Sequence, residues 1–443
     1  MTKADKAVQL TQELIRIDTS NPPGNEESAV LFLEGVLGAE GIKTEIYSPV
    51  PKRANILARI KGKNKGRPVV ILSHIDVVPA KREEWTVDPF GGELKGGFIY
   101  GRGAIDMKAQ TICQLLAFMD LYKAGIEPAQ DVIFLATCDE EVGGQNGVEF
   151  MLRNVPDLKH ASFVLSEGGS IVEENGLVHA QVSVAEKKLG QFRIQARGTG
   201  GHGSMPHRDN ANEKVVRASQ AILSYRWPLK PTSIVSTYLN AVLRGKRGKG
   251  FSFSSLRESL KNKHFRDFVE GNQVYNALLR NTVTLTVLKG GEKVNVIPGE
   301  STAYFDARLL PTESHDNFFK KVRRLCGSEV ELFPIGSDVS RALQSGYNTQ
   351  YFGGIRRVMN ELRGPVPVLP FLTTGATDMR YFRNLGIPAY GFFPITLPND
   401  ELFRMHGIDE RISVANIHEG LEGCREIINF LATCKALQQA NSK

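Results

Sequence analysis

The stretch Val69–Lys108 reads VVILSHIDVVPAKREEWTVDPFGGELKGGFIYGRGAIDMK. It opens with an apolar, β-branched run, which is typical of a strand buried on both faces of a parallel sheet. The run ends in His74 and Asp76, and a glycine-rich turn further on precedes Asp106. In open α/β sheets, ligands collect beyond the carboxyl ends of the strands. An imidazole and two carboxylates at such an end indicate a site for a divalent metal ion.

Two more apolar runs are followed by acids in the same way. Residues 132–137 (VIFLAT) lead into Glu140 and Glu141, and residues 163–165 (FVL) lead to Glu167. Parallel strands end at one edge of a sheet, so we expect these acids near the histidine of the first strand. Adjacent glutamates can divide their roles, because one can bind a metal while the other moves a proton.

Each of these signals has a simpler explanation when it is taken alone. His74 and Asp76 are also compatible with a buried histidine bonded to an aspartate, and Asp106 with the N-cap of a helix. An apolar strand followed by acids also presents the magnesium-binding carboxylate of an NTPase. That function needs a phosphate loop of the form G-x-x-x-x-G-K-[ST], and the sequence contains none.

The composition describes an ordinary water-soluble chain. It has 443 residues, of which 41% are hydrophobic and 23% charged, and this length predicts two or more domains. We find no apolar run of about 18 residues and no signal-peptide core, which predicts no membrane span and a cytoplasmic location. The five cysteines are odd in number and form no C-x-x-C pair, so we expect free thiols.

The net charge of +7 is spread along the chain. Its local basic run, Arg244–Lys249, is typical of a solvated loop, and we predict no nucleic-acid partner.

The order of the patterns predicts an α/β protein with an inserted domain. Residues 1–188 alternate apolar strands with helices, including a helix expected from Asp106 to Ala124. Residues 189–337 contain strictly alternating strands typical of a sheet with one wet face, and residues 338–443 return to the first pattern. We therefore predict a mixed, mostly parallel sheet flanked by helices, interrupted by an α+β domain.

Eight motifs in this chain resemble, in order, those of a family of zinc-dependent metallohydrolases. The family includes aminoacylase, acetylornithine deacetylase, succinyl-diaminopimelate desuccinylase, glutamate carboxypeptidase and the carboxypeptidase S-like N-acyl-amino-acid hydrolases. The motifs are SHIDVVP, YGRGAIDMK, CDEEVGG, SEGG, GGHGSMPH, NVIPGE, TTGATDMR and MHGIDERI.

The resemblance implies a pair of zinc ions, for which cobalt or manganese are alternatives. The first zinc would be bound by His74 and Glu167, and the second by Glu141 and His406, with Asp106 bridging the two. The family pattern also places a cis peptide bond after the bridging aspartate.

The other catalytic roles follow from the same resemblance. Glu140 would be the general base and Asp76 would hold His74. His202 would reach the active site of a neighbouring subunit and help to bind the oxyanion, which implies a homodimer formed through the inserted domain.

Four residues match family positions that face the substrate. Arg308 and Asn295 lie in the inserted domain, and the fork of Arg308 suits a carboxylate. Gly375 and Thr377 lie in a loop that binds a terminal carboxylate in relatives.

These features together predict a dizinc hydrolase that cleaves the amide bond of an N-acyl amino acid or small peptide with a free carboxylate. The alternatives are an exopeptidase, such as a carboxypeptidase or dipeptidase, and a biosynthetic deacylase such as the desuccinylase. A non-catalytic relative that only binds peptides is the alternative from outside the enzymes.

Overall fold

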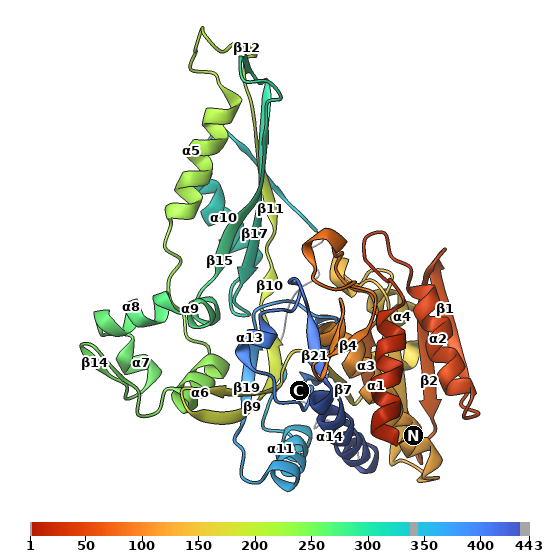
Figure 1. Ribbon diagram of the computed structural model, residues 1–443. Helices are drawn as coiled ribbons and strands as arrows, with labels where there is room; N and C mark the ends of the chain where they lie inside the picture. Colours follow the sequence, from red (N-terminus) through yellow and green to blue (C-terminus); the bar gives the residue numbers. More distant parts are fainter. Residues whose placement is uncertain (1, 337–343, 435–443) are drawn as a thin grey trace. The chain divides into compact units, whose positions relative to one another are not determined.

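The computed structural model describes residues 2–336 and 344–434, and they divide into two compact units (Figure 1). The first unit is drawn from Met1–Val184, Gln344–Phe371 and Thr377–Lys443, and the second from Ala185–Leu343 and Leu372–Ala376. The second unit is thus inserted into the sequence of the first. The domain limits predicted at residues 188 and 337 remain predictions, and residue 337 lies outside the described residues.

The first unit contains a nine-stranded mixed sheet in the order β1-β2-β6-β3-β7-β20-β9-β19, with β8 paired to β9. Its central strands β6, β3, β7 and β20 are parallel to one another, and antiparallel pairs flank them. The predicted fold class is confirmed. The strands are β1 (Thr44–Val50), β2 (Arg53–Ile60), β3 (Asn64–His74), β6 (Gln130–Thr137), β7 (Phe163–Ser166), β8 (Ile171–Glu174), β9 (Leu177–Glu186), β19 (Val368–Thr373) and β20 (Ala389–Gly391).

Helices flank this sheet. The longest, α14, packs against α3, α11 and α1 (Figure 1). The short strands β4 (Glu93–Lys95), β5 (Phe98–Tyr100) and β21 (Arg411–Ser413) form a separate small sheet. The helices are α1 (Lys3–Ile15), α2 (Glu26–Gly38), α3 (Ala109–Lys123), α4 (Val148–Asn154), α11 (Gln350–Arg363), α12 (Met379–Asn384), α13 (Asn399–Leu402) and α14 (Val414–Thr433).

Burial of the central strands explains their uninterrupted apolar sequences. Val70 and Leu72 of β3 are fully buried and share one cluster with Leu135 of β6, Met151 of α4 and Phe382 of α12. Full burial of such a side chain stabilises the fold by about 1.5–3 kcal/mol. The sheet core therefore fixes the positions at which β3, β6 and β7 end.

The register brings these three strand ends to one edge. His74 at the end of β3 lies opposite Thr137 at the end of β6, and Ile71 lies opposite Leu165 of β7. The next strand, β20, approaches so closely that a Cβ added to Gly391 would lie 1.6 Å from the backbone oxygen of Glu167. Glycine is therefore required beside the residue that follows β7.

The predicted helix start at Asp106 is wrong. The α-helix α3 begins at Ala109, and a π-helical turn spans Ala104–Lys108, within which Asp106 (φ −118°, ψ 96°) has a non-helical backbone. The backbone amides of Ile105 and Asp106 donate to the distant carboxylate of Glu410, which a local sequence pattern cannot reveal. The Asp106–Met107 peptide bond is cis, as the family resemblance implied.

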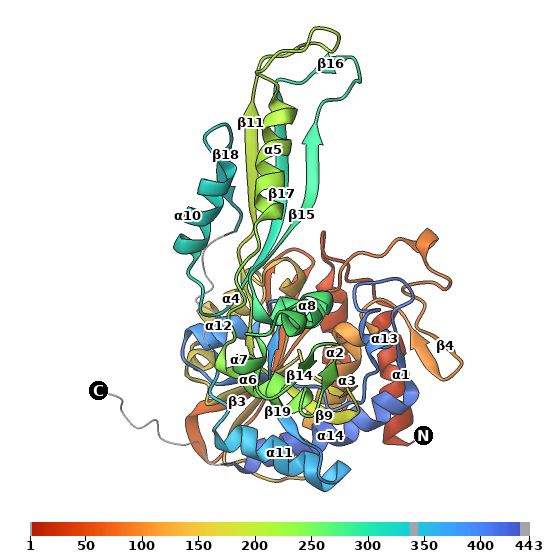
Figure 2. The ribbon, with the colours of Figure 1, turned by 90° about the vertical axis from the view of Figure 1, so that its left-hand side faces the viewer.

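The second unit is an α+β structure. Helices α5 and α10 pack on its main sheet around stacked rings of Phe192 and Phe305, whose centroids are 4.8 Å apart, and α5 runs along the long strands β11 and β17 (Figure 2). The main sheet contains β10 (Lys188–Leu189), β17 (Glu300–Leu309), β11 (Phe192–Arg197), β18 (Glu331–Pro334) and β15 (Thr282–Gly290). Two small sheets pair β12 (Gly201–His202) with β16 (Val296–Ile297) and β13 (Arg247–Gly248) with β14 (Phe251–Ser252). Its helices are α5 (Ala211–Ser224), α6 (Ser233–Val242), α7 (Leu256–Ser259), α8 (Lys263–Gly271), α9 (Gln273–Leu279) and α10 (His315–Cys326).

Two further expectations concern membrane-spanning helices and the cysteines. Among residues 2–336 and 344–434, no helix has the length and apolar character needed to cross a membrane. The expected free thiols are confirmed, and those of Cys113, Cys138, Cys326 and Cys424 are buried.

Candidate active site

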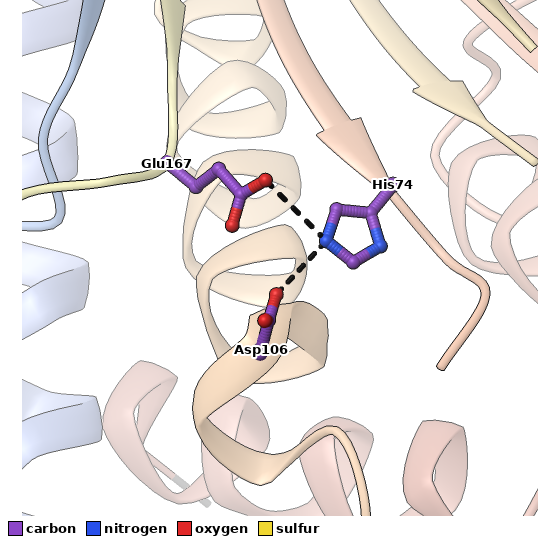
Figure 3. Close-up of side chains that lie close together, drawn as sticks. All are labelled: His74, Asp106 and Glu167. Atoms are coloured by element: carbon purple, nitrogen blue, oxygen red, sulfur yellow. Dashed lines mark hydrogen bonds and ion pairs between the residues drawn. The ribbon is translucent and has the colours of Figure 1, made fainter. Parts of the chain in front are cut away.

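One group of side chains forms where β3 and β7 end. Nε2 of His74 lies 2.9 Å from Oδ1 of Asp106 and 3.5 Å from Oε1 of Glu167. Figure 3 shows both carboxylates directed at this ring nitrogen. His74 is the last residue of β3, Glu167 follows β7, and Asp106 comes from the turn before α3. The potential ligand atoms of the three residues all lie within 4.8 Å of one another.

A second group uses the other oxygen of the same aspartate. Oδ2 of Asp106 lies 3.1 Å from Nε2 of His406, which in turn lies 3.3 Å from Oε1 of Glu141. These three residues meet the same 4.8 Å limit. All five residues predicted as metal ligands therefore lie in two groups that share Asp106.

The donor atoms of both groups fit divalent cations. Each group offers one imidazole nitrogen and two carboxylates, a donor set found in zinc sites. Oε1 of Glu141 is buried and, within the described residues, forms no hydrogen bond. A buried carboxylate oxygen without a hydrogen bond costs free energy unless a cation compensates it. The two groups are therefore suited to hold one cation each.

The titration behaviour of these residues reflects the crowding of their charges. Burial alone would lower the pKa of His74, but Glu167 and Asp106 raise that pKa well above its ordinary value. The hydrogen bond to Asp106 and the close carboxylate of Glu141 raise the pKa of His406 to about 10. Burial and the nearby Asp106 raise the pKa of Glu167 to about 7. The negative charges of the carboxylates thus outnumber the positive charges that could balance them.

Glu140 belongs to neither group, but charged residues of both groups act on its carboxyl group. Burial raises the pKa of its carboxyl group well above the ordinary value, and the neighbouring Glu167 and Asp378 add to this effect. Its backbone N–H donates to Oδ1 of Asp76 at 3.1 Å. A carboxyl group with a raised pKa beside a metal site has the properties of a general base or acid.

Asp76 makes further contacts besides the expected one with His74. Nδ1 of His74 lies 3.0 Å from the backbone oxygen of Asp76 and 3.6 Å from its carboxylate. That carboxylate accepts shorter bonds from the backbone N–H groups of Glu140 and Glu141, both at 3.1 Å, and from Asn21 at 2.8 Å. Asp76 thus fixes the backbone of both glutamates as well as lying beside His74.

A buried ion-pair network behind Glu140 was not foreseen from the sequence. Arg53 bonds through Nε to Glu26 and through Nη2 to Asp139, each at 2.6 Å. Asp139 has a left-handed backbone (φ 74°), and its other carboxylate oxygen accepts from the N–H of Asn146 at 2.8 Å. The network holds the turn that carries Glu140. The only local signal was the acid at Asp139, because its partners lie far away in the sequence.

This network predicts a pH effect on stability. Burial raises the pKa of Glu26 to about 6 from an ordinary value of 4.5. The unfolded chain therefore ionises first, and the folded state loses stability as the pH rises through 6. Relative to Glu26→Gln, the wild type should lose about 2 kcal/mol of unfolding free energy between pH 4.5 and 7. Urea unfolding of both proteins with a chelator present measures this.

The exposed neighbour Glu27 provides the control for that experiment. Glu27→Gln should follow the pH dependence of the wild type. A constant difference between the wild type and Glu26→Gln across this range would contradict the prediction.

The remaining predicted catalytic residue and two predicted substrate residues lie in the second unit. His202 is exposed in β12, where its Nδ1 lies 2.7 Å from the hydroxyl of Ser204. The backbone oxygen of Asn295 accepts from Gly203 at 2.8 Å, so Asn295 and His202 share one end of this unit. Arg308 lies in β17, where its Nε donates to both oxygens of Asp306 at 3.0 and 3.1 Å.

The two predicted loop residues have different environments. Gly375 has open space where a Cβ would be. Thr377 is buried, and its hydroxyl accepts from the N–H of Met379 at 3.3 Å. Arg380 and Tyr381, just beyond this loop, both donate to the backbone oxygen of Gly143, at 2.7 and 2.6 Å. This segment therefore braces the turn after Glu141.

Comparison with known proteins shows which proteins this chain is similar to. Probable carboxypeptidase S-like 2 of Dictyostelium discoideum is 29% identical over 79% of this chain and 69% of its own length. Aminoacylase-1 of Sus scrofa is 28% identical over 97% of this chain and 96% of its own. The crystal structure of an M20 family metallo-carboxypeptidase from Sulfolobus solfataricus superposes with a TM-score of 0.72 at 18% identity, covering 97% of this chain and 99% of that one.

The sequence profile of peptidase family M20/M25/M40 matches residues 70–429, which include all five residues of the two groups. The chain therefore belongs to peptidase family M20/M25/M40 and is a metal-dependent amidohydrolase.

Proposed function

We propose that this protein is a co-catalytic dizinc hydrolase that cleaves the amide bond of N-acyl amino acids or small peptides with a free carboxylate. His74, Asp106 and Glu167 would hold one cation, and Asp106, Glu141 and His406 the other. Zinc suits these donors, and cobalt or manganese can replace it. The observation that carries the proposal is the Asp106 carboxylate, whose two oxygens face two separate groups.

The chain supplies the proton transfer and the positioning. When bound, a pair of cations polarises a carbonyl and makes water more acidic. Glu140 would accept a proton from the attacking water and deliver it to the amide nitrogen as the carbon–nitrogen bond breaks. Asp76 would fix the turn that carries Glu140 through its hydrogen bonds to the backbone of Glu140 and Glu141.

Substrate binding is proposed for residues outside the two groups. The fork of Arg308, with Asn295, Gly375 and Thr377, would bind the carboxylate and the acyl amino-acid backbone. His202 would stabilise the oxyanion in the site of the other subunit of a homodimer formed through the second unit. The names of the relatives, a carboxypeptidase S-like protein and an aminoacylase, support an amide substrate with a free carboxylate.

A substrate panel tests this function. The metal-free protein is reconstituted with zinc, cobalt or manganese and assayed on N-acetyl and long-chain N-acyl amino acids, N-succinyl amino acids and dipeptides. We expect hydrolysis of acyl amino acids or small peptides, and none of amides that lack the carboxylate. Preference for dipeptides would favour the exopeptidase alternative, and preference for N-succinyl substrates the biosynthetic deacylase. Binding of these compounds without turnover under all metals would contradict the proposal.

Arg308 offers a prediction about specificity. Arg308→Lys keeps the charge but removes the bidentate fork. We expect KM to rise roughly 10–100-fold for substrates with a carboxylate, because a charged hydrogen bond contributes about 1.5–3 kcal/mol, with little change in kcat. Initial rates over a range of substrate concentrations measure both constants.

Arg193 of the same sheet, whose guanidinium lies 4.5 Å from the ring of Phe333, provides the matched control. Arg193→Lys should leave KM unchanged. An equal KM for Arg308→Lys and the wild type would remove Arg308 from the binding site.

A further inference from the structure

A buried carboxylate from the end of the chain caps the turn that carries Asp106. Glu410 is fully buried. Its Oε1 accepts from the backbone N–H groups of Ile105 at 2.8 Å and Asp106 at 3.2 Å. Its Oε2 accepts from the N–H of Gly103 at 3.2 Å and from Nη1 of Arg102 at 2.6 Å. One side chain therefore binds four donors around the aspartate shared by the two groups.

The same network reaches His406. Nη2 of Arg102 donates to the backbone oxygen of His406 at 3.3 Å. The side chain of His406 is 49% exposed, and its backbone has a left-handed φ of 61°. Such an exposed side chain receives little positioning from packing, so its place depends on how its backbone is held. The ring of Trp85 lies 5.2 Å from the Arg102 guanidinium and supports it from another side.

We propose that Glu410 is a positioning residue that sets the distance between Asp106 and His406 and thereby the cation affinity of the group Asp106, Glu141 and His406. The inference rests on the proposed metal-binding role of these residues. Residues that hold metal ligands in place commonly change affinity or activity roughly 10–100-fold when they are replaced. Glu410 acts on both ligands, on Asp106 directly and on His406 through Arg102.

The chemistry of the cap requires a carboxylate. Four donors surround its two oxygens, and an ionised carboxylate has acceptor sites for all of them. In Glu410→Gln, an NH₂ group replaces one oxygen and faces two donors, which leaves buried N–H groups unpaired. This replacement has nearly the same size and shape, so its effect would come from the lost acceptor rather than from altered packing.

Cobalt binding provides a readout that does not depend on turnover. Metal-free wild type and Glu410→Gln are titrated with Co²⁺ against a competing chelator, and the visible absorption of the bound cobalt is recorded. The wild type should bind two equivalents. In Glu410→Gln we expect one equivalent to bind roughly 10–100-fold more weakly, with a changed absorption spectrum, and the other to change less. His406→Ala should lose the equivalent bound by Asp106, Glu141 and His406. Comparison with this variant therefore identifies which equivalent Glu410→Gln weakens.

The control separates positioning from a general loss of stability. Asp131 in β6 also accepts from an arginine and a backbone amide, Arg59 at 2.8 Å and Gly62 at 2.9 Å, but lies at the start of its strand, away from the two groups. Asp131→Asn should bind cobalt like the wild type. Equal binding by Glu410→Gln and the wild type would overturn the inference.

Two further outcomes are distinguishable. A wild type that binds fewer than two cations would contradict the proposed function itself. Should Glu410→Gln fail to fold, Arg102→Gln tests the same link. It removes the bonds of Arg102 to Glu410 and to the backbone of His406, and keeps the turn Ala104–Lys108 and the Glu410 carboxylate. Arg102→Gln should weaken the same equivalent, and unchanged cobalt binding in this folded variant would overturn the inference.

Discussion

Replacing Glu140 with Gln is expected to lower kcat by roughly 10²–10⁴-fold, the usual contribution of a general acid–base residue. Both cations should stay bound, because Glu140 belongs to neither group of potential ligands. The amide keeps the shape of the side chain but cannot accept a proton from water. Steady-state assays, with the metal content of the same samples measured in parallel, test the prediction.

The neighbouring residue provides a matched control on the same turn. Glu141→Gln should weaken the binding of one cation, since Glu141 lies in the group with His406. The two variants should therefore separate, with Glu140→Gln losing turnover at full metal content and Glu141→Gln losing metal. Wild-type turnover in Glu140→Gln, or a loss of cation by that variant, would exclude the base assignment.

The positions of the strand ends could be predicted because they depend on apolar patterns in the local sequence. Apolar runs such as 69–72 and 132–137 bury on both faces and are parallel neighbours in the sheet. The residues that follow them must then meet at one edge, which places His74 close to Glu167. His406 was different. No apolar strand leads to it, and only the motif resemblance indicated that it would join Asp106.

An error arose where a regular element started later than its pattern suggested. Asp76 was expected to hold His74, and its carboxylate does lie 3.6 Å from Nδ1 of that ring. The same carboxylate also accepts from backbone N–H groups of the next loop, which the sequence did not indicate. The error concerns the helix start, because the apolar pattern after Asp106 is helical but the helix itself begins at Ala109.

The supporting polar networks could not be read from the sequence because their partners are distant. Arg53 joins Glu26 to Asp139 across separate elements, and Glu410 binds amides about three hundred positions earlier in the chain. A charged residue in a sequence is most often a solvated one. Only the fold shows that these few are buried and paired.

Replacing Asp106 with Ala should affect both cations at once, which no other ligand replacement is expected to do. Its Oδ1 faces His74 and its Oδ2 faces His406, so the variant removes one donor from each group. We expect both equivalents of cobalt to bind at least about 100-fold more weakly, the upper end of the effect of supporting residues. Activity at stoichiometric metal should be lost. Chelator-competition titration measures both affinities in one experiment.

Replacing a ligand that belongs to only one group provides the control for this experiment. His74→Ala should mainly weaken one equivalent and His406→Ala the other, since each imidazole lies in one group. Asp106→Asn keeps the shape of the side chain but offers a single acceptor oxygen and no charge. Its affinities for the two equivalents of cobalt should therefore lie between those of Asp106→Ala and the wild type. An Asp106→Ala protein that still bound one equivalent with wild-type affinity would show that the aspartate serves a single cation, because a bridging carboxylate cannot be removed from one site alone.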